Sequence, residues 1–139
     1  MSAGSGLPEA VVGVIHDAGR FLLIRRADGI PAGGWWTPPS GRVEPGETQP
    51  EALVREMREE LGLEVTPLRH IWTCPTADGR FLLNWWLAEA DDLATTPDPT
   101  EVAEVRWCTV DELRALSPTF ADDVRFFVEV WPTIADQPS

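Results

Sequence analysis

The stretch that decides the fold runs from Gly41 to Leu63 and reads GRVEPGETQPEALVREMREELGL. Thr48 and Glu51 have the spacing of a capping box, in which each side chain accepts a hydrogen bond from the other residue's backbone N–H. Gly62 provides the kind of residue with which helices commonly end. We therefore predict an ordered loop, a helix over Gln49 to Leu61 and a turn.

The predicted helix has an apolar side and an acidic side. Its apolar residues recur at helical spacing, at Leu53, Met57 and Leu61. Glu56 precedes Glu59 by three residues and Glu60 by four, so the three carboxylates share one face. A solvated face balanced by neighbouring arginines is one explanation. A bound divalent cation is the other, since Mg²⁺ prefers oxygen ligands.

The whole stretch resembles the signature of the Nudix hydrolases: glycine, five residues, glutamate, seven residues, and then Arg-Glu-aliphatic-x-Glu-Glu-x-Gly-aliphatic. The fixed positions of that signature fall on Gly41, Glu47, Arg55, Glu56, Met57, Glu59, Glu60, Gly62 and Leu63. The resemblance implies an α/β fold, namely an α/β/α sandwich with a mixed, curved β-sheet. It also implies a metal-dependent enzyme with Mg²⁺ as its cofactor and Mn²⁺ as a substitute.

The resemblance assigns metal-binding and catalytic roles to residues of this sequence. Glu59 and Glu60 are implied to hold the metal, with Glu56 as a further ligand or as the base. The backbone carbonyl of Ser40 is implied to join the metal shell. Relatives usually have Pro-Gly-Gly before the signature, whereas this chain has Pro39-Ser40-Gly41, so the loop is stiffer and bulkier here.

Four further residues of the signature are expected to support the site. Arg55 is implied to pair with Glu47, because an arginine fork orients a carboxylate in a way that lysine cannot. Gly41 allows the backbone to approach closely, and Gly62 ends the helix.

Outside the signature, several residues are candidates for the site. Relatives often supply another glutamate before a strand that contains a tryptophan, and Glu101 has the comparable spacing, with Glu104 as its competitor. Arg26 resembles a position that contacts substrate in relatives, although a solvated strand-end arginine is the alternative. Trp36 could stack on a nucleobase and Asn84 could read a base edge, but large aromatics on strands usually belong to the core and buried amides usually bond backbone.

The rest of the chain predicts one domain. We expect a flexible tail over residues 1–7, the domain over residues 8–133 and a second tail over residues 134–139, with fraying after Pro132. Expected strands cover residues 10–15, 20–26, 64–73, 80–89 and 104–109, and expected helices after the signature cover residues 110–116 and 121–131. In the last helix, the apolar face is expected to contain Val124, Phe127, Val128 and Trp131.

Composition limits the partners. With 11 basic and 23 acidic residues the formal net charge is −12, which disfavours general binding of a nucleic-acid polymer. No apolar run reaches the roughly 18 residues of a membrane span. The two cysteines, Cys74 and Cys108, have no metal-ligand spacing, and this cysteine usage favours a cytoplasmic protein. We expect either a monomer or a homodimer.

These observations lead to a functional hypothesis. The resemblance implies hydrolysis of a nucleoside diphosphate linked to a variable group. The compact chain looks most like the MutT-type enzymes, which points to a (d)NTP or oxidised (d)NTP converted to a nucleoside monophosphate and pyrophosphate. ADP-ribose, nucleotide sugars and dinucleoside polyphosphates are the alternative substrates, and a non-catalytic nucleotide-binding module is a further alternative.

Overall fold

A mixed sheet forms the centre of the molecule. The computed structural model describes residues 6–135, so parts of both expected tails lie outside the described residues. Neighbouring strands follow the order β3-β2-β1-β6-β5, with β4 also paired to β1 and β7 to β2. The β1–β6 pair is parallel and the other pairs are antiparallel. The strands are β1 (Glu9–Asp17), β2 (Arg20–Arg26), β3 (Trp36–Thr37), β4 (Ser40–Arg42), β5 (Thr66–Pro75), β6 (Leu82–Glu89) and β7 (Val102–Cys108).

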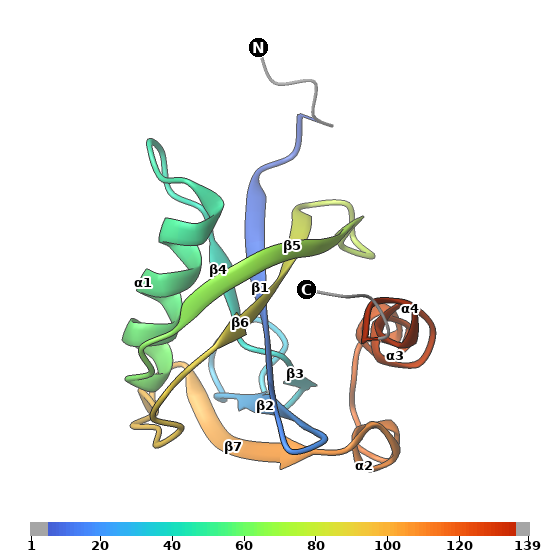
Figure 1. Cartoon of the computed structure of the whole chain (residues 1–139). Helices are drawn as coiled ribbons and strands as arrows, with labels where there is room; N and C mark the ends of the chain where they lie inside the picture. The colour runs from blue at the N-terminus through green and yellow to red at the C-terminus, as the bar shows by residue number, and fades with distance from the viewer. Residues whose placement is uncertain (1–5, 136–139) are drawn as a thin grey trace.

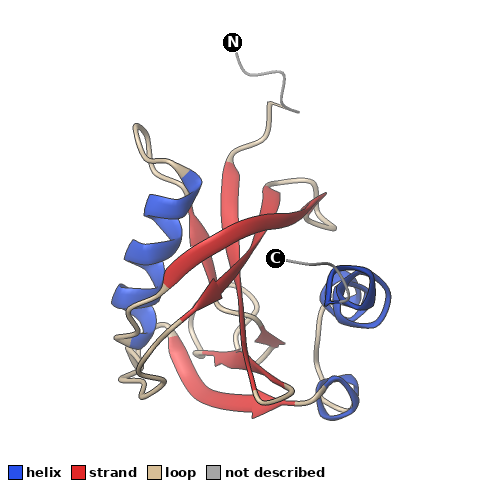
Figure 2. Cartoon of the chain, viewed as in Figure 1, coloured by secondary structure: helices blue, strands red, loops and turns tan. Residues whose placement is uncertain are grey.

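Helices cover the sheet on two sides, which confirms the expected α/β/α sandwich (Figures 1 and 2). Helix α1 lies on one side, and the helices that follow β7 lie on the other. The helices are α1 (Gln49–Leu61), α2 (Val110–Arg114), α3 (Ala121–Arg125), a π-helical segment (Phe126–Val130) and α4 (Trp131–Ala135). No helix among residues 6–135 is long and apolar enough to cross a membrane.

Two buried clusters hold these layers together. Alternate side chains of a strand point to opposite faces of a sheet. Accordingly, Val11 of β1 belongs to the cluster under α1, whereas Val12 belongs to the cluster under the C-terminal helices. Trp85 and Phe126, both fully buried, stack in the second cluster with ring centroids 4.3 Å apart.

Helix α1 has the predicted limits and the predicted caps. The Thr48 side chain accepts from the N–H of Glu51, and the Glu51 side chain accepts from the N–H of Thr48. Gly62 ends the helix in the left-handed conformation, at φ 61°, and its N–H reaches the carbonyls of Arg58 and Met57. The first and last residues of α1 are thus set by the capping residues next to it in the sequence.

The C-terminal segment differs from its expected helical pattern. The wider turn of the π-helical segment shifts the buried face, so Phe126 is fully buried and Val128 is 37% exposed. The prediction that Val128 packs in the core is therefore wrong. Helix α4 continues through Pro132 to Ala135, and Ile134 is buried, so the expected fraying after Pro132 does not occur there.

Candidate active site

The site forms where β4 meets the second half of α1. Gly41 of β4 lies against the Glu56 carboxyl group, and a side-chain carbon at position 41 would collide with that group. Glu60, one turn further along α1, is only 7% exposed. Its Oε2 atom has no hydrogen-bond partner among the described residues. The signature glycine is therefore required by the close approach of a backbone strand to a carboxylate.

Several charged groups act on Glu60. Burial, the adjoining Glu56 carboxyl group and the charge of Glu101 raise the pKa of Glu60, while the positive charge of Arg26 opposes that shift. Backbone bonds keep these elements together: the N–H of Ala27 donates to the Glu101 carbonyl over 3.0 Å, and the N–H of Asp98 donates to the Glu60 carbonyl over 2.8 Å. The charged groups that act on Glu60 are thus two other carboxyl groups, Glu56 and Glu101, and the guanidinium of Arg26.

Arg55 connects the loop of the signature to the helix. Its Nε and Nη2 atoms donate to the two carboxylate oxygens of Glu47 over 2.7 and 2.9 Å, as the resemblance implied. Nη1 donates to Glu56 over 2.7 Å and to Glu59 over 3.1 Å, and Nη2 also reaches the carbonyl of Arg42. The bonds to Arg55 lower the pKa of Glu47 to about 2, and the bonds to Glu47 raise the pKa of Arg55.

The carboxylates are suitable ligands for a hard cation, but in this structure they do not converge on one position. Within residues 6–135, no three acidic, histidine or cysteine side chains form a ready metal site. Glu56 and Glu59 are instead bonded to Arg55, and the side chain of Glu59 is 59% exposed. The donor set nevertheless fits Mg²⁺, because it consists of oxygens and includes the unpartnered, buried Oε2 of Glu60.

The two candidate glutamates before Trp107 lie in different environments. Glu101 is the one whose charge acts on Glu60. Glu104 forms ion pairs with Arg25 over 3.4 Å and with Arg106 over 2.9 Å, and both pairs lower its pKa. The structure therefore brings Glu101, and not Glu104, into the electrostatic surroundings of Glu60.

Two side chains that were predicted to contact the substrate contact other residues of the protein instead. Trp36 is 6% exposed and belongs to the core on the other side of the sheet, with the guanidinium of Arg106 4.7 Å above its ring. Asn84 is 4% exposed; its amide group donates to Glu9 and accepts from Thr73. The geometry thus contradicts open contact of either side chain with a nucleobase and agrees with the alternatives of core packing and internal hydrogen bonding.

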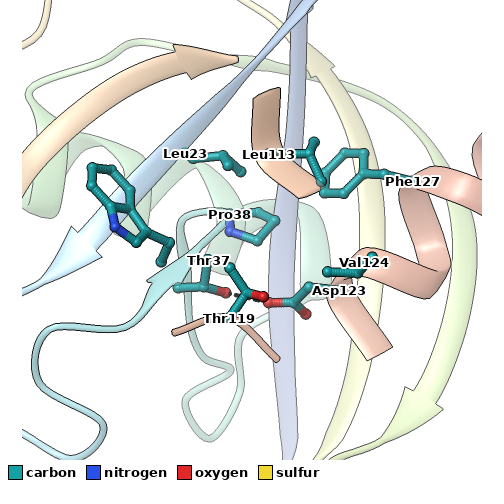
Figure 3. A pocket seen from close by; sticks show the side chains of 9 residues that line it. Leu23, Thr37, Pro38, Leu113, Thr119, Asp123, Val124 and Phe127 are labelled. Carbon is teal, nitrogen blue, oxygen red and sulfur yellow. Dashed lines mark hydrogen bonds between the residues drawn. The ribbon is translucent and has the colours of Figure 1, made fainter. Parts of the chain in front are cut away.

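Sequence reasoning missed a buried polar pair beneath α3. Thr37 donates a 2.8 Å hydrogen bond to Oδ2 of Asp123, in a small pocket that Leu23, Pro38 and Phe127 also line (Figure 3). Burial raises the pKa of Asp123 to about 7. No signal in the sequence indicated this pair, because an aspartate near a helix start usually serves the exposed first turn.

The structure thus contains an acidic helix, tied by Arg55 to a strand and a loop, within an α/β/α sandwich. The family model described as NUDIX domain matches residues 6–129, and the chain belongs to that family. Members of the Nudix family generally use divalent metals.

Curated relatives have more than one named activity. The chain is 35% identical over 106 residues to the CTP pyrophosphohydrolase of Escherichia coli (strain K12), covering 75% of this chain and 77% of that enzyme. It is 36% identical over 86 residues to the NAD-capped RNA hydrolase NudC of Vibrio vulnificus (strain CMCP6), covering 62% of this chain. The chain matches only 33% of the length of the Vibrio enzyme.

Solved structures agree on the fold. The solution structure of the E. coli ORF135 protein has a TM-score of 0.72 at 27% identity, covering 94% of this chain and 91% of that chain. The crystal structure of a MutT protein from Methanosarcina mazei Go1 has a TM-score of 0.78 at 21% identity, covering 98% and 100%. The expected Nudix-type fold is therefore confirmed.

Proposed function

We propose that this chain hydrolyses the pyrophosphate bond of a (d)NTP or oxidised (d)NTP, with Mg²⁺ as its cofactor, and releases a nucleoside monophosphate and pyrophosphate. The observation that carries the proposal is the buried Glu60 carboxylate, which has an unpartnered oxygen and lies near Glu56, Glu101 and Arg26. A buried carboxylate among like charges is unfavourable unless a cation is present. This cluster therefore suits a cation that also binds phosphate oxygens.

The residues of the chain have separate tasks in this proposal. Glu56, Glu59 and Glu60, with the Ser40 carbonyl, would hold the cation, while Arg26 would contact a phosphate group. In the reaction, a water oxygen bonds to one phosphorus of the α–β anhydride and the bond from that phosphorus to the bridging oxygen breaks. The bridging oxygen leaves with pyrophosphate if water attacks the α-phosphorus, or with the nucleoside monophosphate if water attacks the β-phosphorus. A bound divalent cation neutralises charge on the phosphate oxygens and lowers the pKa of water. Glu56 and Glu101 are the candidate acceptors for the proton of that water.

Because the net charge is −12, binding of a polyphosphate substrate is expected to depend on a bound cation. An acidic protein repels a polyphosphate, and bound divalent ions reverse this locally. The oxygen-only donor set suits both ions, so Mg²⁺ is proposed as the cofactor and Mn²⁺ as its substitute.

Other substrates follow from the relatives. One solved neighbour, at 24% identity and a TM-score of 0.74, is a C. elegans Ap4A hydrolase. The named activity of the Vibrio relative makes NAD-capped RNA a second candidate substrate. The overall charge disfavours a polymer, but a short capped end requires few phosphate contacts.

The proposal is tested by one substrate panel. Product release with Mg²⁺ would be measured for NTPs, dNTPs, an oxidised guanine nucleotide, ADP-ribose, a nucleotide sugar, a dinucleoside polyphosphate and a short NAD-capped RNA. The controls are chelation by EDTA and the double variant Glu59→Gln, Glu60→Gln. We expect one triphosphate to dominate and both controls to abolish turnover. Preference for the capped RNA would replace the proposed substrate, and nucleotide binding without turnover would favour the non-catalytic module.

A further inference from the structure

A polar network outside the carboxylate cluster joins β1, β6 and the first residue of α1. Oε1 of Glu9 accepts a hydrogen bond from Gln49 Nε2 over 2.6 Å and another from Asn84 Nδ2 over 3.1 Å. Gln49 in turn accepts from Nε1 of Trp86 over 2.8 Å. Since Asn84 is buried and Gln49 starts the helix, Glu9 connects the core of the sheet to the N-terminus of α1.

The backbone of the same residue holds the other end of the loop before α1. We call residues 43–48 the box loop. The N–H of Val43 donates to the Glu9 carbonyl over 3.0 Å, while the Gln49 side chain bonds the Glu9 carboxylate. The residues at the start of the box loop and directly after its end thus both bond to Glu9. Arg55 holds this loop through Glu47 and the Arg42 carbonyl.

This double attachment affects the candidate active site. Strand β4 presents Gly41, and α1 presents Glu56 in direct contact with it. The box loop is the covalent connection between these two elements, and Glu9 bonds both of its ends. Removing the Glu9 side chain would break its bonds to Gln49 and Asn84 and leave the Val43 bond to the Glu9 carbonyl in place. It would therefore act on the position of α1 relative to β4 without touching Gly41 or Glu56.

We propose that Glu9 is a positioning residue for hydrolysis, which holds the start of α1 and the box loop in the arrangement that the carboxylates require. The inference rests on the proposed function for its catalytic consequence. Its structural part depends only on the hydrogen bonds described. Both side-chain donors meet on one oxygen of Glu9, so a glutamine at this position keeps an acceptor there, whereas an alanine removes it.

The test compares Glu9→Ala and Glu9→Gln with the unchanged chain. Glu89→Ala is the matched control, because Glu89 is an exposed glutamate at the end of β6. We expect Glu9→Ala to lower kcat about tenfold, with KM for the nucleotide changed less than about twofold, since small displacements of catalytic groups reduce the rate steeply. Glu9→Gln and Glu89→Ala should stay within about twofold of the original kcat.

Hydrogen exchange provides a readout that does not require activity. In Glu9→Ala, the amides of Glu44 and residues 46–48 and the indole N–H of Trp86 should exchange at least about tenfold faster. The amide of Val43, which bonds the backbone carbonyl of residue 9, and the amides of β7 should keep their rates. Unchanged exchange in the box loop would overturn the proposal. So would a loss of thermal stability with unchanged kcat at a temperature where the variant is folded. If the original chain hydrolyses no substrate, the proposed function fails, and exchange alone still decides whether Glu9 holds the loop.

Discussion

Among residues 6–135, one acidic side chain is buried on each face of the sheet, and the two have different surroundings. Glu60, on the α1 side, has an oxygen without a partner and lies among other carboxylates. Asp123, on the opposite side, accepts a hydrogen bond from Thr37 and is surrounded by apolar side chains. Burial raises the pKa of both groups. Asp123 therefore has a hydrogen-bond partner inside the protein, whereas one oxygen of Glu60 has none among the described residues. This difference distinguishes a structural carboxylate from a candidate functional one.

The largest expected effect is that of Glu60→Gln. If Glu60 holds the cation, this change should lower the hydrolysis rate by about 10³-fold. It should also raise the stability of the metal-free protein by about 1 kcal/mol, because glutamine has no carboxyl group whose charged form is disfavoured in this buried position. Nucleotide turnover and urea unfolding measure the two effects. Glu64→Gln, at an exposed residue that pairs with Arg58, is the control and should change turnover little. A parallel loss of activity and stability in Glu60→Gln would contradict the comparison.

The second effect concerns the close approach of β4 to α1. Gly41→Ala places a carbon where the Glu56 carboxyl group lies, so the helix or the strand must move. We expect a loss of activity of about 100-fold. Ser40→Ala is the control: the proposed metal contact uses the backbone carbonyl, so its activity should remain within about threefold of the original. Steady-state kinetics with Mg²⁺ titration distinguishes the two, and equal losses would show that the side chain at position 40 matters.

A smaller effect tests which of the two glutamates before Trp107 belongs to the site. Glu101→Gln removes a charge that acts on Glu60 and should lower kcat about tenfold. Glu104→Gln breaks ion pairs with Arg25 and Arg106 on partly exposed side chains and should leave kcat within about twofold. The reverse ranking in the same assay would transfer the additional glutamate from position 101 to position 104.

The smallest effect on activity is expected for Asp123→Asn, which instead changes how stability depends on pH. The folded pKa of Asp123 is about 7 against an ordinary value of 3.8, so the folded state binds this proton more tightly. Stability from this group is therefore present below about pH 4 and is lost as the pH rises through 7. Asparagine can still accept from Thr37, and the variant should be more stable than the original at pH 8 by roughly 2–4 kcal/mol.

Urea unfolding at pH 5 and pH 8 tests the Asp123 prediction, with Asp122→Asn as the neighbouring control. The original chain and the control should both lose stability between the two pH values. Asp123→Asn should lose less, because only the contribution of Asp123 is removed and that of Glu60, whose pKa is also raised, remains. A pH dependence unchanged by Asp123→Asn would mean that the buried carboxylate is not the group responsible.

Local sequence determined α1 and much of the site. The caps at Thr48, Glu51 and Gly62 are short-range bonds, so the limits of the helix could be read directly. The arginine fork between Arg55 and Glu47 also lies within the signature, and the resemblance supplied it. Residues three and four apart on a helix share a face whatever the tertiary structure, which explains why the acidic side was predictable.

The tertiary structure alone decided the contacts between distant segments. The sequence left Glu104 as a competitor of Glu101. The pairing of β7 with β2 separates them, since Glu104 lies opposite Arg25 while the Glu101 carbonyl bonds Ala27. The partner of Asn84 is Glu9, 75 residues away. The sequence by itself thus determined the helix, its caps and the order of its charges, because those depend on short-range geometry. Packing across the sheet decided which groups surround Glu60 and which buried carboxylate has a hydrogen-bond partner. No local pattern of the sequence encodes that packing.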